Sequence, residues 1–311
     1  MVITKTPMRV SIIGGGTDYP QYYKKNHYGC VVSCAIDVYV HVLVKDRRDT
    51  DIAIHWSRPE RVTAVDEIQH ELIREAMKLL NIPGGVEIAT IADIDSRGCG
   101  LGSSSAVLVG VLNALHAYRG TYVSNPAELA LSATYIEQKI LRKPIGLQDA
   151  WPCAIGGSNY FRFYPNEDCV HYPVPIDVSK LLLFKCGDFR SADIICEKTG
   201  ESTFKNTQAL NEMKFLTEDL AKGEIFVPEA LKSGWNIKKS LVPDISNNTV
   251  DEWIEKILAA GATGAKLCGS GGSGYIVAHA KPELHDKIKA EIGLTCLSIN
   301  EAEGSTIIYN G

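Results

Sequence analysis

One short segment, Arg97–Ala106 with the sequence RGCGLGSSSA, combines residue types that suit the binding of a phosphate group. Its glycines allow the backbone to approach an anion closely, and its serines open an apolar stretch. At the start of a helix, free N–H groups and the positive end of the helix dipole favour a negative charge. Serine hydroxyls in that first turn can also reach a metal ion bound to the phosphates. The alternative is a glycine turn that only packs a helix against a sheet.

Two further glycine segments carry weaker signals. Gly269–Gly274 (GSGGSG) matches GxGxxG, but it follows a predicted helix and precedes a strand, the reverse of a dinucleotide-binding fingerprint. We therefore expect a turn that packs against a ligand or against the serine-rich loop. Gly14–Asp18 (GGGTD) sets a carboxylate beside a bare backbone, where Asp18 can accept hydrogen bonds from sugar hydroxyls. A surface turn with a helix-capping aspartate is the alternative there.

Strands and helices must position these segments. The predicted strands and helices do not alternate regularly along the chain, so the predicted fold class is α+β. Apolar and β-branched patterns predict strands over 31–44, 86–92, 158–163, 181–186, 274–280, 297–300 and 305–309. Helical periodicity predicts helices over 66–81, 103–118, 125–141, 203–221, 228–240, 250–260 and 282–291.

For two of these helices the sequence predicts more than their extent. The helix over 103–118 is apolar on nearly all sides, so we expect it to be central and buried. The helix over 125–141 has Asn125 as its cap, Pro126 at its first position and Glu128 three residues beyond the cap. The polar segment 164–175 is the best candidate for a boundary, which gives domains over 1–170 and 171–311.

Composition excludes several classes of protein. The 311 residues carry 32 Lys+Arg and 37 Asp+Glu, a net charge of −5, so the chain lacks the basic excess of a nucleic-acid binder. No apolar stretch is long enough to span a membrane, and the N-terminus does not resemble a signal peptide. Nine cysteines without a CxxC pair favour reduced thiols over a disulfide framework or a zinc site. We expect a cytoplasmic protein.

In their order along the chain, the glycine segments resemble the motifs of the GHMP kinases, the superfamily of galactokinase, homoserine kinase, mevalonate kinase and phosphomevalonate kinase. The three matching stretches are PMRVSIIGGGTDY at 7–19, GCGLGSSSA at 98–106 and KLCGSGGSG at 266–274. The segment Gly146–Asp149 occupies the place of the catalytic aspartate. The resemblance implies a domain like domain 2 of ribosomal protein S5, followed by a ferredoxin-like domain, with ATP and a sugar in the cleft between them.

Within the superfamily, the triple glycine, the strand 31–37 and the segment 189–192 are most similar to kinases of D-glycero-D-manno-heptose 7-phosphate. Those enzymes phosphorylate the anomeric hydroxyl to give the 1,7-bisphosphate, on the route to nucleotide-activated heptose and surface polysaccharides. One departure is LQDAW at 147–151, where those kinases tend to carry KQDQY. The alternatives are a kinase of a fucose-, galactose- or octose-type sugar, and a sugar or ATP sensor without catalytic activity.

The resemblance also implies roles for individual residues. Asp149 is the expected general base and Arg9 its partner, with a capping aspartate and a structural salt bridge as the alternatives. Mg²⁺ is expected on Ser104 and Glu137, although Ser103 and Ser105 remain possible ligands and Glu137 can be a surface residue. The ATP phosphates are expected on Gly98, Gly100, Leu101, Gly102, Ser103, Ser104 and Ser105.

The sugar phosphate is expected on Gly15, Gly16, Thr17, Asp18, Arg190, Ser191, Gly271 and Gly272. Arg190 and Ser191 are the candidates for its phosphate, and Lys266 can serve either that phosphate or ATP. Trp56 or Ser57 can contribute to an adenine pocket, with a core tryptophan as the alternative. From the resemblance, the partners are ATP, Mg²⁺ and a small sugar phosphate, in a monomer or a homodimer.

Overall fold

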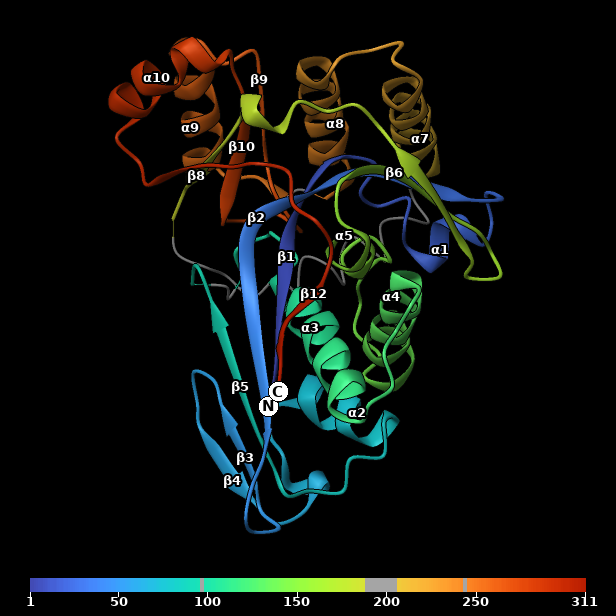
Figure 1. Cartoon of the computed structure of the whole chain (residues 1–311). Helices are drawn as coiled ribbons and strands as arrows, with labels where there is room; N and C mark the ends of the chain where they lie inside the picture. The colour runs from blue at the N-terminus through green and yellow to red at the C-terminus, as the bar shows by residue number, and fades with distance from the viewer. Residues whose placement is uncertain (96–97, 188–205, 243–244) are drawn as a thin grey trace.

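A computed structural model of the chain describes residues 1–95, 98–187, 206–242 and 245–311, which form two β-sheets with helices packed on them (Figure 1). The larger sheet has the strand order β12-β1-β2-β5-β3-β4, and β6 and β7 extend it beside the first half of β2. Its strands are β1 (Val2–Ile13), β2 (Gly29–Asp46), β3 (Ile52–His55), β4 (Glu60–Val62), β5 (Val86–Ala92), β6 (Ser158–Phe163), β7 (Cys169–Pro173) and β12 (Thr306–Asn310).

The smaller sheet has the order β11-β8-β10-β9 and lies with helices α7 to α10 at one end of the molecule, at the top of Figure 1. Its strands are β8 (Leu181–Lys185), β9 (Gly264–Leu267), β10 (Tyr275–His279) and β11 (Cys296–Ser298). The helices there are α7 (Thr207–Lys222), α8 (Val227–Leu241), α9 (Asn248–Ala259) and α10 (His285–Ile292), with single 3₁₀ turns η3 (Val178–Lys180) and η5 (Pro282–Leu284).

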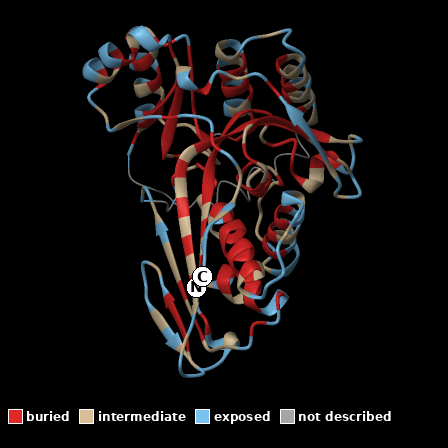
Figure 2. Cartoon of the chain, viewed as in Figure 1, coloured by how far each residue is buried: buried red, intermediate tan, exposed pale blue. Residues whose placement is uncertain are grey.

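Strand β2 shows how the sequence pattern sets burial. Its first eight residues, GCVVSCAI, are all buried, because the strand there is covered on both faces. From Asp37 onwards buried and partly exposed residues alternate, as expected for a strand with one solvated face. The first half of β2 therefore lies in the interior near the smaller sheet, and the second half leads to the open end of the larger sheet (Figure 2).

Helix α3 (Ser103–Tyr118) packs on β1 and β2 and is buried along almost its whole length, as its apolar sequence predicts (Figure 2). Around it lie α2 (Glu71–Leu79), α4 (Pro126–Tyr135), the π-helical turn η2 (Ile136–Ile140) and α5 (Ala150–Ile155), while α1 (Pro20–Tyr23) and the 3₁₀ turn η1 (Val65–Glu67) are short. No helix in the described ranges is long and apolar enough to cross a membrane.

The mixed α+β class is confirmed, and the predicted bounds of β5, β6 and α3 agree with the structure. The predicted helix over 125–141 instead ends as the π turn η2, and the helix over 66–81 is interrupted between η1 and α2. Strands β1, β3, β4, β7 and β9 are not among the strands predicted from the sequence. A division at residue 170 assigns β12 to the second domain, whereas in the structure β12 pairs with β1 of the larger sheet.

Candidate active site

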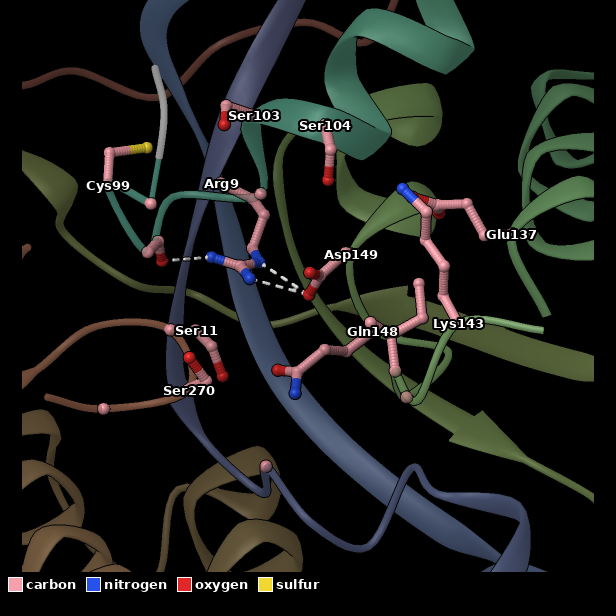
Figure 3. Close-up of a pocket in the computed structure, with 18 of the residues that line it drawn as sticks. Arg9, Ser11, Cys99, Ser103, Ser104, Glu137, Lys143, Gln148, Asp149 and Ser270 are labelled. Carbon is pink, nitrogen blue, oxygen red and sulfur yellow. Dashed lines mark hydrogen bonds and ion pairs between the residues drawn. The ribbon is translucent and has the colours of Figure 1, made fainter. Parts of the chain in front are cut away.

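A cavity of about 1040 Å³ lies between the two halves of the chain (Figure 3). The larger sheet and its helices contribute residues of β1, the glycine segment 14–16, the loop before α3 and the turn before α5. The other half contributes residues of α8, β9 and the glycine segment 269–273. The three glycine segments recognised in the sequence therefore meet at one cavity, which is large enough for two small ligands.

The loop before α3 is formed by glycines in left-handed conformations. Gly100 has φ of +78° and Gly102 has φ of +72°, and the helix begins directly after them at Ser103. The first helical hydrogen bond runs from the Ala106 N–H to the Gly102 carbonyl, so the preceding amides lie at the free N-terminal end of a long buried helix. This arrangement can hold an anion, as the sequence predicts.

The third glycine segment packs directly against this loop. A Cβ atom added to Gly269 would lie 2.4 Å from the Gly100 Cα, and one added to Gly100 would lie 2.7 Å from the Cys268 carbonyl oxygen. Only glycine permits so close an approach of two backbones. The expectation that this segment packs against the serine-rich loop is confirmed, and the contact joins the two halves of the cavity wall.

Arg9 of β1 and Asp149 of the turn before α5 form an ion pair in the wall of the cavity (Figure 3). The Arg9 Nη2 and Nε atoms donate to Asp149 Oδ1 at 2.6 and 3.2 Å, and Nη1 donates to the Gly100 carbonyl at 2.7 Å. Burial of Arg9 opposes its charge, but the carboxylate raises the pKa of the guanidinium above its usual value. Asp149 Oδ2 makes no hydrogen bond to the described part of the chain and remains available to a ligand.

Glu137 lies in the π turn and lines the cavity, although it is only 1% exposed. Its Oε2 accepts a hydrogen bond of 2.8 Å from the Ser105 hydroxyl, and its Oε1 is buried with no hydrogen-bond partner within residues 1–95, 98–187, 206–242 and 245–311. Burial raises the pKa of Glu137 to about 7, although the Ser105 bond opposes the shift. π turns are rare and occur mostly at functional sites.

The surroundings of Glu137 suit a hard cation that brings further oxygen ligands with it. Ser104 is exposed and lines the cavity, whereas Ser105 is buried against Glu137. Among the described residues no three His, Cys, Asp or Glu side chains cluster as a complete metal site. One orphaned carboxylate oxygen and a nearby hydroxyl, completed by phosphate oxygens and water, fit the ligand preferences of Mg²⁺.

Asp18 and Thr17 are fully buried and do not line the cavity. The Asp18 carboxylate accepts hydrogen bonds from the Gly16 N–H at 2.9 Å and the Gln148 N–H at 3.2 Å, and burial raises its pKa to about 6. A Cβ atom on Gly146 would lie 1.8 Å from Asp18 Oδ2. In this structure Asp18 therefore ties the first glycine segment to the turn that carries Asp149.

The remaining predicted residues divide into three groups. Those that line the cavity are Gly15, Gly16, Gly98, Gly100, Gly102, Ser103, Ser104 and Gly271. Leu101, Ser105 and Gly272 lie beside it without forming its wall. Arg190 and Ser191 lie outside the described residues.

The structure adds wall residues that the sequence analysis missed as ligand-binding groups, among them Ser11, Gln148 and Lys238. Ser11 Oγ and Gln148 Oε1 are buried polar atoms without a hydrogen-bond partner in the part of the chain that the structure describes, and both residues line the cavity. Figure 3 shows Ser11 beside Ser270 of the third glycine segment, across Arg9 from Ser103. The available signals were that Ser11 follows Arg9 by two residues on β1 and that Gln148 precedes Asp149.

Another part of the cavity wall carries apolar and aromatic side chains. Trp56, Ser57 and His70 line it together with Ile91, which is 68% exposed, and Val107 of α3. The rings of Trp56 and His70 meet edge to face with centroids 4.6 Å apart. An exposed apolar wall with aromatic rings suits a planar base.

Comparison with known proteins places this geometry in a family. The family model described as the GHMP kinases N terminal domain matches residues 66–157, and the model described as GHMP kinases C terminal matches residues 227–293. A D-glycero-alpha-D-manno-heptose 7-phosphate kinase of Campylobacter jejuni is 26% identical, with 92% of each chain covered. A galactokinase of Pyrococcus furiosus is 24% identical over 93% of this chain and 90% of its own.

Solved structures share the fold over almost the whole chain. A D-glycero-D-manno-heptose 1-phosphate kinase from Bacteroides thetaiotaomicron has a TM-score of 0.72 at 21% identity, with all of both chains covered. The Lactococcus lactis galactokinase complexed with galactose has a TM-score of 0.80 at 16% identity, covering 98% of this chain and 94% of the other. The family models, supported by the common fold and the meeting of the three glycine segments, show that the chain belongs to the GHMP kinases.

Proposed function

We propose that this kinase transfers the γ-phosphoryl group of ATP to the anomeric hydroxyl of D-glycero-D-manno-heptose 7-phosphate, giving the 1,7-bisphosphate and ADP. Membership of the family and the kinase relatives establish the coarser activity, that of an ATP-dependent sugar kinase. The observation that carries the proposed reaction is the Arg9–Asp149 pair, which lies between an anion-binding loop and a polar wall within one cavity.

The nucleotide fits one part of this cavity. Its phosphates would lie at the phosphate end, defined as residues 98–104 together with Glu137, and its base at the apolar and aromatic part of the wall beside Trp56. When bound there, Mg²⁺ neutralises charge on the phosphates, and Glu137 and Ser104 are the residues that would hold it. The orphaned Glu137 Oε1 supports this assignment, because a buried oxygen without a partner is unfavourable unless a ligand completes it.

Asp149 would act as the general base for the acceptor hydroxyl. The hydroxyl oxygen bonds to the γ-phosphorus, the bond from that phosphorus to the β,γ-bridging oxygen breaks with ADP as the leaving group, and the hydroxyl proton passes to Asp149. Arg9 holds Asp149 Oδ1 and leaves Oδ2 open, so the carboxylate is oriented and still able to accept the proton. Its positive charge also lies next to the charge that develops during transfer.

The acceptor would lie at the acceptor end, defined as Ser11, Gln148, Lys238 and Lys266, all of which line the cavity. The unpaired Ser11 Oγ and Gln148 Oε1 can hydrogen-bond sugar hydroxyls, which otherwise find few acceptors in an enclosed site. The similarity to a heptose 7-phosphate kinase over 92% of the chain supports heptose 7-phosphate over the galactose of other relatives.

A panel of acceptors tests this proposal. Purified protein is incubated with Mg-ATP and heptose 7-phosphate, unphosphorylated heptose, mannose, fucose or galactose, and ADP release is followed. We expect turnover with heptose 7-phosphate and a product whose new phosphorus resonance couples to the anomeric proton. Turnover only with galactose or fucose would reject the proposed acceptor, and ATP binding without turnover of any sugar would favour a sensor.

A further inference from the structure

We propose that Lys266 and Lys238 together bind a phosphate group on the cavity wall formed by the second half of the chain. Under the proposed function, on which this identification rests, the group is the acceptor's own phosphate. The same chemistry can also come from the terminal phosphate of the nucleotide. Either way, the two lysines would form a phosphate subsite of side chains that adjoins the backbone loop before α3.

Lys266 is a buried cation with no partner among the described residues. It lies on β9, where its neighbours Ala265 and Leu267 point into the core of the smaller sheet and Lys266 faces the cavity instead. Lys266 is only 6% exposed, and its side chain makes no hydrogen bond or ion pair with any residue in the described ranges. Burying an ammonium group in this way is costly unless a ligand compensates its charge.

Lys238 approaches the same wall from α8. It lies four residues after Gly234 and three before Leu241, and all three line the cavity from one face of the helix. Its Nζ donates to the Gly269 carbonyl of the third glycine segment, which fixes the position of the ammonium group. The hydroxyl of Ser270 lies in the same wall and can add a further hydrogen bond to a bound anion.

The electrostatic surroundings of Lys266 call for a negative charge. Burial and then repulsion by Lys238 lower the pKa of Lys266 to about 7, and Arg9 adds to the repulsion. Only the Cys268 thiol acts in the opposite direction among its main influences. A phosphate dianion would compensate the Lys266 charge and could accept a hydrogen bond from each ammonium group, and charge-assisted hydrogen bonds of this kind are the strong ones.

The location of the lysines suits a ligand with groups at both ends. On one side of Arg9, the Nη1 atom donates a hydrogen bond to the Gly100 carbonyl. Gly269 packs against Gly100, and its carbonyl accepts the hydrogen bond from Lys238. On the other side, Arg9 Nε and Nη2 donate to Asp149. Lys238 and the proposed base thus lie on different sides of Arg9. In heptose 7-phosphate the phosphate and the anomeric hydroxyl are likewise at opposite ends of the carbon chain.

The first test measures binding of inorganic phosphate to the nucleotide-free enzyme by calorimetry, in wild type, Lys266→Met and Lys238→Met. Lys232→Met, an exposed lysine on the same helix, is the matched control. We expect the Kd for phosphate to rise about 10- to 100-fold in each lysine variant and to stay unchanged in the control. Because this probe is not a substrate, the result does not depend on the proposed acceptor.

The source of the phosphate is assigned by two further measurements on the same variants. A rise in the KM for heptose 7-phosphate with an unchanged Kd for AMPPNP assigns the subsite to the acceptor. A weaker AMPPNP complex with an unchanged acceptor KM assigns it to the nucleotide. If wild type turns over no sugar phosphate, the proposed function fails while the phosphate measurement still decides the subsite.

Folding of the variants is checked separately by thermal unfolding at pH 7. Because folding lowers the pKa of Lys266, its charged form is destabilising at neutral pH, and Lys266→Met should unfold at the same or a higher temperature. Unchanged affinities for inorganic phosphate, heptose 7-phosphate and AMPPNP in both folded variants would overturn the proposal.

Discussion

The phosphate end of the cavity is built mainly from backbone, and the acceptor end is built from side chains. At the phosphate end, glycines with positive φ angles and the first turn of α3 form the wall, and Gly100 is fixed against Cys268. At the acceptor end, Ser11, Gln148 and Lys266 present polar atoms that have no partner in the described chain. Backbone groups recognise a feature common to all nucleotides, whereas side chains can differ with the acceptor.

The largest effect is expected where the two ends meet, at Asp149→Asn. The variant keeps the size of the side chain but cannot accept the proton, so kcat should fall roughly 10²–10⁴-fold. The affinity for Mg-AMPPNP, measured by calorimetry, should change little because the phosphate end is intact. Asp286→Asn on the fully exposed surface is the control, and wild-type turnover by Asp149→Asn would show that another group is the base.

At the phosphate end, Glu137→Gln tests whether the Glu137 carboxylate binds Mg²⁺. The amide keeps an acceptor for the Ser105 hydroxyl but loses the negative charge, so the Mg²⁺ concentration needed for half-maximal activity should rise about 10- to 100-fold. A Mg²⁺ titration of the rate measures this, with the exposed Glu128→Gln on α4 as the control. An unchanged titration curve would remove Glu137 from the metal site.

Gly100→Ala tests the contact between the two halves of the wall. The added methyl group would meet the Cys268 carbonyl at 2.7 Å in a backbone with φ of +78°, so AMPPNP binding should weaken about 10-fold. Gly223→Ala has the same φ of +78° and nothing within 4 Å of the added atom, so it carries the backbone strain without the contact. Equal losses of affinity in the two variants would mean that the contact is unimportant.

At the acceptor end, Gln148→Met replaces an unpaired amide by an apolar group of similar size. We expect the KM for the acceptor to rise about 2- to 10-fold, the effect of one hydrogen bond, while the KM for ATP is unchanged. The exposed Gln208→Met on α7 is the control in steady-state kinetics. A change in the KM for ATP alone would place Gln148 at the phosphate end instead.

The smallest effect on activity is expected at Asp18, whose contribution depends on pH. Folding raises its pKa from 3.8 to about 6, so the native state binds more protons and stability falls as pH rises through this interval. Relative to Asp18→Asn, wild type should lose on the order of 3 kcal/mol between pH 4 and pH 7. Parallel stability curves for the two proteins, measured by urea unfolding, would show that Asp18 has an ordinary pKa.

The difference between the phosphate end and the acceptor end also explains which parts of the site could be predicted from the sequence. The loop at 98–106 is contiguous, and its glycines and serines determine local backbone structure, so its role and the start of α3 were both predictable. The acceptor end takes Ser11 from β1, Gln148 from a turn, Lys238 from α8 and Lys266 from β9, and only long-range packing brings them together.

Two details show where local patterns stop being informative. The capping residues predicted the start of α4, but nothing in its sequence marks the wider turn at Ile136–Ile140 that carries Glu137. The pairing of β12 with β1 joins residues some 300 positions apart, and sequence periodicity does not report such partners. The sequence predicts that Asp18 binds a ligand, because it follows a triple glycine. The sequence does not show that the Asp18 carboxylate is buried in the folded chain.

The central claim is that one cavity holds ATP at a backbone wall and a phosphorylated sugar at a side-chain wall. It is tested most directly by the ratio of kcat/KM for heptose 7-phosphate to that for unphosphorylated heptose, with Mg-ATP saturating. We predict a ratio of at least about 100, because two charge-assisted contacts to the phosphate are lost with the unphosphorylated sugar. A ratio near one would contradict the account.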